Sequence, residues 1–372
     1  MSQDSLKARA TELLDLAGIR INGNAPTDLK VHDEHLFTRV FAHGSLGMGE
    51  SYMDGWWDAD DLPGCLTKLL GSHLDERLHT LSTVILHLRA KYLNTQRGRG
   101  AFVIGKAHYD TGNDLFARML GKYMMYSCGY YANVDNLDDA QEAKLDLLCR
   151  KLQLQPGQKV LDIGCGWGEA LKFAAERYGV SGVGVTVSEE QAKFAREKCQ
   201  GLPIEIHLQD YREVTDTFDA IYSIGMFEHV GGQNYRTYFE MVRRCLKPGG
   251  LSVLHCCGSN ATPSQPDPWI EKYIFPNSVI PSASQVTKAL ENLFVIEDWH
   301  NFSADYDRTL MAWIANFDAA WPEISGNYDE RFRRMWHFYL ACSAAIFRCR
   351  RDQLWQITLS PDGVPGGYRV PR

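Results

Sequence analysis

The sequence predicts an α/β protein with a Rossmann-like, mostly parallel sheet, preceded by a small N-terminal α+β domain. Three observations predict it. Residues 160–168, VLDIGCGWG, join a short apolar strand to three glycines and then to a helical pattern. Strand and helix patterns then alternate up to residue 257, as consecutive βαβ units require. The first 100 residues instead mix short helix and strand patterns and carry no catalytic signature.

Length and composition limit the class of protein. The 372 residues have room for two domains, and 45% of them are hydrophobic, which is ample for a core. The net charge of −7 argues against a dedicated nucleic-acid-binding protein. The ten cysteines form no C-x-x-C pair, which argues against a secreted disulfide framework.

The same features predict the compartment. The first residues lack a basic region followed by an apolar run, so no signal peptide is evident. No segment approaches the roughly 18 apolar residues of a transmembrane helix. We therefore expect a soluble, cytoplasmic protein with reduced thiols, no metal centre and no nucleic-acid partner.

The N-terminal part begins with a predicted helix over 5–17, where apolar residues recur at helical spacing. A strand over 19–23 enters an Asn-Gly turn, a short alternating stretch covers 29–31, and an apolar helix covers 36–41. Residues 44–57 are dense in glycine and aromatics. They suit a packed loop and a lipid-facing surface equally well.

A basic stretch follows over 77–106. Its apolar residues recur on one helical face, and it contains no Asp or Glu. Such a helix can lie on an anionic membrane or simply connect two parts of the core. We predict three regions: a lipid- or membrane-associated module over 1–90, a linker over 91–106 and a catalytic domain over 107–372.

After the mixed polar and aromatic residues of 108–131, a helix over 137–152 precedes the glycine loop. The predicted elements beyond the loop are helix 169–178, strand 182–187, a helix opened by a capping box at 188–191, strands 204–208 and 218–224, helix 234–246 and strand 251–257. Ligands of open parallel sheets bind at the carboxyl ends of the strands. The residues expected to converge there are 164–168, Thr186, 209–211, Glu228 and His255.

The glycine loop could hold a dinucleotide or S-adenosylmethionine. A dinucleotide fingerprint needs G-x-G-x-x-G and an acidic residue about 20 positions further on. Here the spacing is G-x-G-x-G, and the next strand ends in Thr186. Asp162, just before the loop, suits a ligand amine or an ordering hydrogen bond. The loop therefore predicts a methyl-donor site.

The C-terminal third is rich in aromatic residues and shows no further strand pattern. Helix-spaced aromatics are typical of a core, but their number also suits a helical cap with an apolar channel over the site. Six arginines add a basic edge suited to phosphate groups or to an ordinary solvated helix face: Arg331, Arg333, Arg334, Arg348, Arg350 and Arg351.

Taken together, the motifs at 47–57, 126–128, 161–168, 227–231, 254–255 and 305–306 resemble those of the bacterial cyclopropane-fatty-acyl-phospholipid synthases over nearly the whole chain. The mycolic acid cyclopropane synthases are more distantly similar and lack the N-terminal module. The resemblance implies a class I methyltransferase fold with a mostly parallel seven-stranded sheet and a helical cap.

The resemblance also implies a reaction. A methyl group passes from S-adenosylmethionine to a cis double bond in the acyl chain of a membrane phospholipid, and proton loss then closes a cyclopropane ring. A homodimer bound peripherally to the inner face of the membrane is expected. Two alternatives are methylation of the double bond without ring closure and a non-catalytic lipid-binding protein.

In this family the proton acceptor is thought to be a bound bicarbonate. The positions that match its ligands are Cys128, Glu228, His255, Tyr306 and the backbone of Cys257. Without the resemblance, each of them except Glu228 suits ordinary packing. Cys342 matches a cysteine once proposed as the nucleophile, but a thiolate has no obvious task in methylating an alkene, which favours packing.

For the methyl donor, the resemblance and the strand-end positions together suggest one set of residues. These are Tyr126, Ser127, Asp162, Gly164, Cys165, Gly166, Gly168, Thr186, Gln191, Gln209, Asp210 and Tyr211. Within this set, Thr186 and Gln191 are expected at the ribose, and Asp210 and Tyr211 at the adenine.

Overall fold

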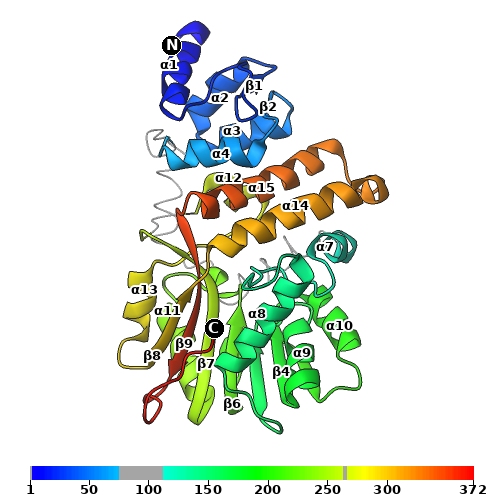
Figure 1. Cartoon of the computed structure of the whole chain (residues 1–372), viewed down its shortest axis with the longest axis vertical. Coiled ribbons are helices and arrows are strands. Elements are labelled where there is room, and N and C mark those ends of the chain that lie inside the picture. The colour runs from blue at the N-terminus through cyan, green and yellow to red at the C-terminus, as the bar shows by residue number, and fades with distance from the viewer. Residues whose placement is uncertain (1, 75–111, 263–265) are drawn as a thin grey trace. The chain divides into compact units, whose positions relative to one another are not determined.

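The structure is a computed structural model that describes residues 2–74, 112–262 and 266–372 (Figure 1). The predicted linker over 91–106 and the basic stretch over 77–106 lie outside the described residues.

The chain divides into two compact units that are not contiguous in sequence. Unit 1 comprises Met1–Leu93, Ser264–Pro276 and Tyr306–Asp352, and unit 2 comprises Asn94–Pro263, Asn277–Asp305 and Gln353–Arg372. Two C-terminal segments thus group with the N-terminal residues.

Unit 1 is mainly helical. Its helices are α1 (Gln3–Leu16), α2 (His35–His43), α3 (Ser45–Met53), α4 (Leu62–Gly71), α12 (Pro268–Tyr273), α15 (Glu330–Arg348) and, except for its first two residues, α14 (Ala304–Ile324). Strands β1 (Lys30–Val31) and β2 (Trp57–Asp58) pair antiparallel. The helices expected near 5–17 and 36–41 are thus confirmed. The strand expected over 19–23 is reduced to a single bridge between Ile21 and Leu29.

The expectation of a loop over 44–57 was wrong, because most of this segment forms α3. Its glycines permit close contacts between helices rather than breaking the helix. A Cβ on Gly47 would lie 2.4 Å from the backbone oxygen of Arg39, and one on Gly49 would lie 2.4 Å from the Trp269 ring. A larger residue at either position would separate α3 from its neighbours.

Helix α15 packs against α3 and α4 within unit 1. The arginines of the expected basic edge are largely engaged there. Arg331 lies 3.0 Å from the Asp54 carboxylate, and Arg334 lies 2.7 Å from that of Asp58. Arg348 likewise pairs with Asp307. The aromatic residues on α14 and α15 are mostly core: Trp313, Phe317, Trp336, Phe338, Tyr339 and Phe347 are buried.

Unit 2 is built on a seven-stranded sheet with the order β5-β4-β3-β6-β7-β9-β8 (Figure 1). The strands are β3 (Lys159–Ile163), β4 (Ser181–Thr186), β5 (Ile204–Leu208), β6 (Phe218–Ile224), β7 (Leu246–Ser259), β8 (Val295–Asn301) and β9 (Asp352–Ser360). β3 is parallel to β4 and β6, β4 to β5, and β6 to β7, while β8 and β9 pair antiparallel. The mostly parallel seven-stranded sheet of a methyltransferase fold is therefore confirmed.

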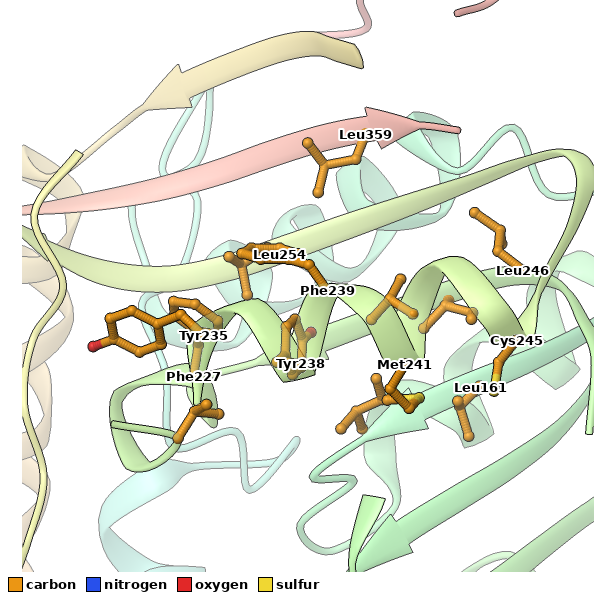
Figure 2. Packing of buried hydrophobic residues seen from close by; sticks show 14 of the residues in the cluster. Leu161, Phe227, Tyr235, Tyr238, Phe239, Met241, Cys245, Leu246, Leu254 and Leu359 are labelled. Carbon is orange, nitrogen blue, oxygen red and sulfur yellow. The ribbon is translucent and has the colours of Figure 1, made fainter. Parts of the chain in front are cut away.

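The helices of unit 2 are α7 (Asn113–Leu120), α8 (Leu137–Lys151), α9 (Glu169–Tyr178), α10 (Glu189–Lys198), α11 (Tyr235–Cys245) and α13 (Ala283–Leu290). Alternate residues of the strands point to opposite faces, which gives two hydrophobic clusters. One contains side chains of α8, α9 and α10, and the other contains side chains of α11 and α13. Figure 2 shows the second cluster, where Tyr238 and Phe239 of α11 lie among Leu161, Leu254 and Leu359 from the sheet.

The expectation of no strand in the C-terminal third was wrong, because β8 and β9 belong to the sheet. Strand β9 lies between β7 and β8, and all nine of its residues are buried. Polar Gln356 and Thr358 alternate with Trp355 and Ile357 and are themselves fully buried. No helix among the described residues is long and apolar enough to cross a membrane.

Candidate active site

The glycine loop lies where the strand order reverses. The chain runs outward from β3 to β4 and β5 and then returns to β6 on the other side of β3, a switch point at which open sheets bind ligands. Gly164, Gly166 and Gly168 all have positive φ angles, of 82°, 53° and 83°. A Cβ on Gly164 would lie 2.6 Å from Met226, whereas Gly166 faces open space. The loop therefore needs glycine for its backbone conformation and leaves room for a ligand.

A pocket with about 1170 Å³ of empty space, including its mouth, opens at this point. All of the predicted donor-binding residues except Gly168 line it: Tyr126, Ser127, Asp162, Gly164, Cys165, Gly166, Thr186, Gln191, Gln209, Asp210 and Tyr211. Met226 and His229 complete one wall. Burial lowers the pKa of His229 to about 4, so its imidazole is neutral at physiological pH.

Thr186 and Gln191, the residues expected at the ribose, contact one another. The Thr186 hydroxyl lies 3.1 Å from Gln191 Oε1 and accepts a hydrogen bond from the Ser188 amide at 3.2 Å. Ser188 caps α10 by accepting from the Gln191 amide. Only this half of the predicted capping box forms, because the Gln191 side chain turns to Thr186. The two polar groups at the end of β4 are thereby fixed at the pocket wall.

Asp210, expected at the adenine, accepts hydrogen bonds from Arg212. Its Oδ1 accepts from the amide of Arg212 at 3.0 Å and from Nε at 2.9 Å, and its Oδ2 lies 2.5 Å from Nη2. This bidentate pair holds the turn after β5 in place. Any contact that Asp210 makes with a ligand must therefore use the lone pairs that Arg212 leaves free.

Asp162 lies at the end of β3 and is nearly fully buried. Its Oδ1 has no hydrogen-bond partner among the described residues. Burial raises the pKa of Asp162 to about 8, and the charge of Lys144 opposes the rise. A buried carboxyl oxygen without a partner in a pocket wall can accept a hydrogen bond from a ligand, so these residues fit S-adenosylmethionine.

A second polar cluster lies beside the pocket. The turn Phe227–His229 follows β6, and Glu228 Oε1 accepts a hydrogen bond from the Cys257 amide at 2.7 Å. Burial raises the pKa of Glu228, and this hydrogen bond limits the rise. Within the part of the chain that the structure describes, Glu228 Oε2 and His255 Nε2 are buried and have no hydrogen-bond partner.

His255 is held on β7 by its own surroundings. Its Nδ1 lies 3.3 Å from Gln356 Nε2, and its ring packs edge-on against Phe302 at 5.8 Å. Burial, together with the charges of Lys144 and Lys151, lowers the pKa of His255 well below its ordinary value. The imidazole is therefore neutral and retains one nitrogen for a ligand.

The other predicted catalytic positions fall in different places. Cys128 is fully buried in unit 2, and its thiol donates to the Gly129 carbonyl at 3.1 Å. Tyr306 and Cys342 belong to unit 1. There Tyr306 packs against Phe347 with ring centroids 4.5 Å apart, and burial raises the pKa of the Cys342 thiol well above its ordinary value.

Three polar residues near these clusters are not predicted from the sequence: Gln141 and Lys144 on α8, and Gln356 on β9. All three are fully buried. The first two carried a signal, because they occupy positions of the apolar face that runs through Ala140, Leu145 and Leu148. Polar residues on such a face indicate a specific partner in the interior.

Known proteins resemble this chain over most of its length. The family model of mycolic acid cyclopropane synthetase matches residues 97–357. The cyclopropane-fatty-acyl-phospholipid synthase of Escherichia coli strain K12 is 54% identical over 364 residues, which cover 98% of this chain and 95% of that protein. The tuberculostearic acid methyltransferase of Mycobacterium tuberculosis is 33% identical over 92% of this chain and 84% of its own length.

Solved structures of methyltransferases have a similar fold. A mycolic acid cyclopropane synthase complexed with SAH and CTAB is 31% identical and superposes with a TM-score of 0.65, over 69% of this chain and 97% of that one. A coclaurine N-methyltransferase superposes with a TM-score of 0.68 over 84% of this chain, at 21% identity, and supports the fold alone.

Proposed function

The chain belongs to the mycolic acid cyclopropane synthetase family, and we propose that it forms cyclopropane rings in the unsaturated acyl chains of membrane phospholipids. It is an S-adenosylmethionine-dependent methyltransferase. The acceptor is the cis double bond of the acyl chain, by analogy with the Escherichia coli relative, whose name states a fatty-acyl-phospholipid product.

One observation carries the proposal: the donor pocket and the Glu228–His255 cluster adjoin each other. Gly225 lines the pocket, and its amide donates to the His255 carbonyl at 2.9 Å. Glu228 follows three residues later and is bound to the amide of Cys257, two residues after His255. A methyl group delivered from the pocket would thus lie near polar groups able to hold the base that accepts a proton.

When bound, S-adenosylmethionine supplies an electrophilic methyl group. The glycine loop admits the donor closely, and Asp162 offers an unpartnered carboxyl oxygen. Because an alkene is a weak nucleophile, the site must exclude water and hold the reactants in line. The apolar wall formed by Met124, Met125 and Met226 suits that requirement.

We further propose that a bicarbonate ion supplies the base for ring closure. The fit rests on the buried, unpartnered Glu228 Oε2 and His255 Nε2, each of which can hydrogen-bond such an ion. The Cys257 amide is engaged by Glu228, so its role is to orient that carboxylate. Cys128 is proposed as a further hydrogen-bond donor.

The deciding experiment is to incubate the purified protein with S-adenosylmethionine and vesicles of cis-unsaturated phospholipid, and to examine the lipid by proton NMR. Mass alone does not decide, because a ring and a methylated alkene weigh the same. Upfield ring-methylene signals are the expected result. Branched or olefinic methyl signals would instead favour methylation without ring closure, and unchanged lipid would refute both.

We also propose that the N-terminal module and the basic stretch over 77–106 dock the protein, as a homodimer, on an anionic membrane surface. The support is the composition of that stretch, in which no Asp or Glu interrupts the cations. Removing the module is a poor test, because α15 packs against α3 and α4.

A better test neutralises Arg89, Lys91, Arg97 and Arg99 together by substitution with Gln. Cosedimentation with vesicles containing phosphatidylglycerol should fall, while binding to phosphatidylcholine vesicles should not change. Equal binding of wild type and variant to the anionic vesicles would refute docking by this stretch. Sedimentation equilibrium tests the homodimer, and a monomeric mass at working concentration would exclude it.

A further inference from the structure

Helix α8 holds the pocket segment 125–130 through residues outside the predicted site. The Tyr130 amide donates to the Ala140 carbonyl at 2.8 Å. Gln141 Nε2 donates to the Ser127 carbonyl at 2.9 Å, and Lys144 Nζ donates to the Ser127 hydroxyl at 2.9 Å. Because positions 141 and 144 are three apart, they lie on one face of the helix. Ser127 is thus held at both its carbonyl and its hydroxyl.

The side chains of Gln141 and Lys144 are both fully buried. Among the residues that the structure describes, the Ser127 hydroxyl is the sole hydrogen-bond partner of Lys144 Nζ. Burying an ammonium group without a carboxylate in contact is unfavourable, so a lysine here points to a role beyond packing. A methionine at this position would fill the same space with an apolar chain of similar length.

The direction of the hydrogen bond between Lys144 and Ser127 defines this role. An ammonium group has three donors and no acceptor, so the Ser127 oxygen must accept. The Ser127 hydroxyl proton is then free to point elsewhere, and Ser127 lines the donor pocket. If Lys144 were a neutral amine, it could accept this proton and turn it away from the pocket.

We propose that Lys144 and Gln141 are positioning residues that direct the Ser127 hydroxyl proton toward a hydrogen-bond acceptor of the bound S-adenosyl compound. This inference deepens the proposed function and rests on its donor site. Neither residue touches the ligand. Lys144 sets the direction of the hydroxyl, and Gln141 sets the position of the backbone that carries it.

The proposal makes binding dependent on pH. Burial lowers the pKa of Lys144 to about 7, and the charges of Cys128 and Asp162 oppose this. Asp162 titrates nearby, with a pKa raised by burial to about 8, while His255 stays neutral because its pKa is lowered well below its ordinary value. Affinity for the ligand should therefore fall as the pH rises through about 7 and Lys144 loses its proton.

The test is calorimetric titration with S-adenosylhomocysteine from pH 5.5 to pH 8.5. At pH 6, Lys144→Met should weaken binding by roughly tenfold or more, the loss expected for a charge-assisted hydrogen-bond arrangement. The decline of affinity with rising pH should also be much smaller in this variant than in the wild type. Combining it with Ser127→Ala should weaken binding little further, because both substitutions remove the same interaction.

The matched control is Lys151→Met on the same helix. Lys151 is equally buried, but its partner is Asp298, 3.1 Å away and outside the pocket. Wild-type affinity in Lys144→Met, or an equal loss in Lys151→Met, would overturn the proposal. If Lys144→Met does not fold, the wild type is compared with Ser127→Ala. The decline of affinity near pH 7 must be present in the wild type and much smaller in Ser127→Ala. Because this assay needs no lipid, it stays separate from the test for ring formation.

Discussion

Replacing Glu228 by Gln tests the proposed proton-accepting cluster with a minimal change of shape. The glutamine keeps an oxygen that can accept from the Cys257 amide, so the 2.7 Å hydrogen bond and the turn at 227–229 should persist. The free energy of unfolding should change by no more than about 1 kcal/mol, the difference between a charge-assisted and a neutral hydrogen bond. What the variant loses is the negative charge on the buried, unpartnered Oε2.

A positioned acid or base contributes about 100- to 10,000-fold to a rate, so ring formation should fall by at least about 100-fold because the variant no longer holds the bicarbonate base. Affinity for S-adenosylhomocysteine should not change, because Glu228 does not line the donor pocket. The assay is the NMR ring-methylene signal measured against time, with calorimetry on the same sample. Glu240→Gln, on the exposed face of α11 beside Arg236, is the control for removing one negative charge.

The pH dependence of the same reaction has a defined sign. Burial raises the pKa of Glu228, so the carboxyl loses its charge at a higher pH than an exposed glutamate does. Ring formation by the wild type should fall as the pH drops through that raised pKa, and this fall should be absent from Glu228→Gln. A ring yield of Glu228→Gln within about twofold of the wild type, with donor binding intact, would refute the assignment, since losing the bicarbonate base that Glu228 holds should cost at least about 100-fold.

Three further predictions concern packing, linkage and the thiols. Gly258→Ala places a Cβ 2.2 Å from the Trp355 ring and should lower the free energy of unfolding by about 1–3 kcal/mol in urea denaturation, whereas Gly326→Ala, with open space around it, should not. Burial lowers the pKa of Lys151 to about 8, so the unfolded chain holds this proton more tightly above pH 8. Between pH 8 and 10 the wild type should gain stability over Lys151→Met by up to about 1.4 kcal/mol per pH unit, and a constant difference would contradict this. Cys342→Ala should form rings at close to the wild-type rate, because burial keeps this thiol protonated; a large loss would restore the nucleophile hypothesis.

Much of the sheet could be predicted from the sequence because its elements have strong end signals. Helix 169–178 and strands 204–208 and 218–224 agree with the structure residue for residue. Gly168 and Gly179 flank the helix, Pro203 precedes the first of these strands, and Gly225 follows the second. The glycine loop alone predicted a ligand site, because three glycines between an apolar strand and a helix leave few alternatives.

The failures have physical reasons as well. Strand β9 is buried on both faces, so its alternating Gln356 and Thr358 resemble a solvent-facing pattern although both are fully buried. Helix α3 contains Gly47 and Gly49, which local propensity treats as breakers. Tertiary contact with Arg39 and Trp269 decides their conformation, and no local pattern reports such a contact.

The two buried lysines of α8 show how a structure separates a functional residue from a packed one. Lys151 has a carboxylate 3.1 Å away, and the Asp298 of that pair is also held by Arg372 at 2.7 Å. A fixed ion pair of this kind accounts for its own burial. Lys144 has the same burial and the same helix, but its contact is a neutral hydroxyl on a residue that lines the donor pocket. Among the described residues no carboxylate lies within ion-pair distance of Lys144, so the proposed role of its charge is to direct the Ser127 hydroxyl when the pocket is filled.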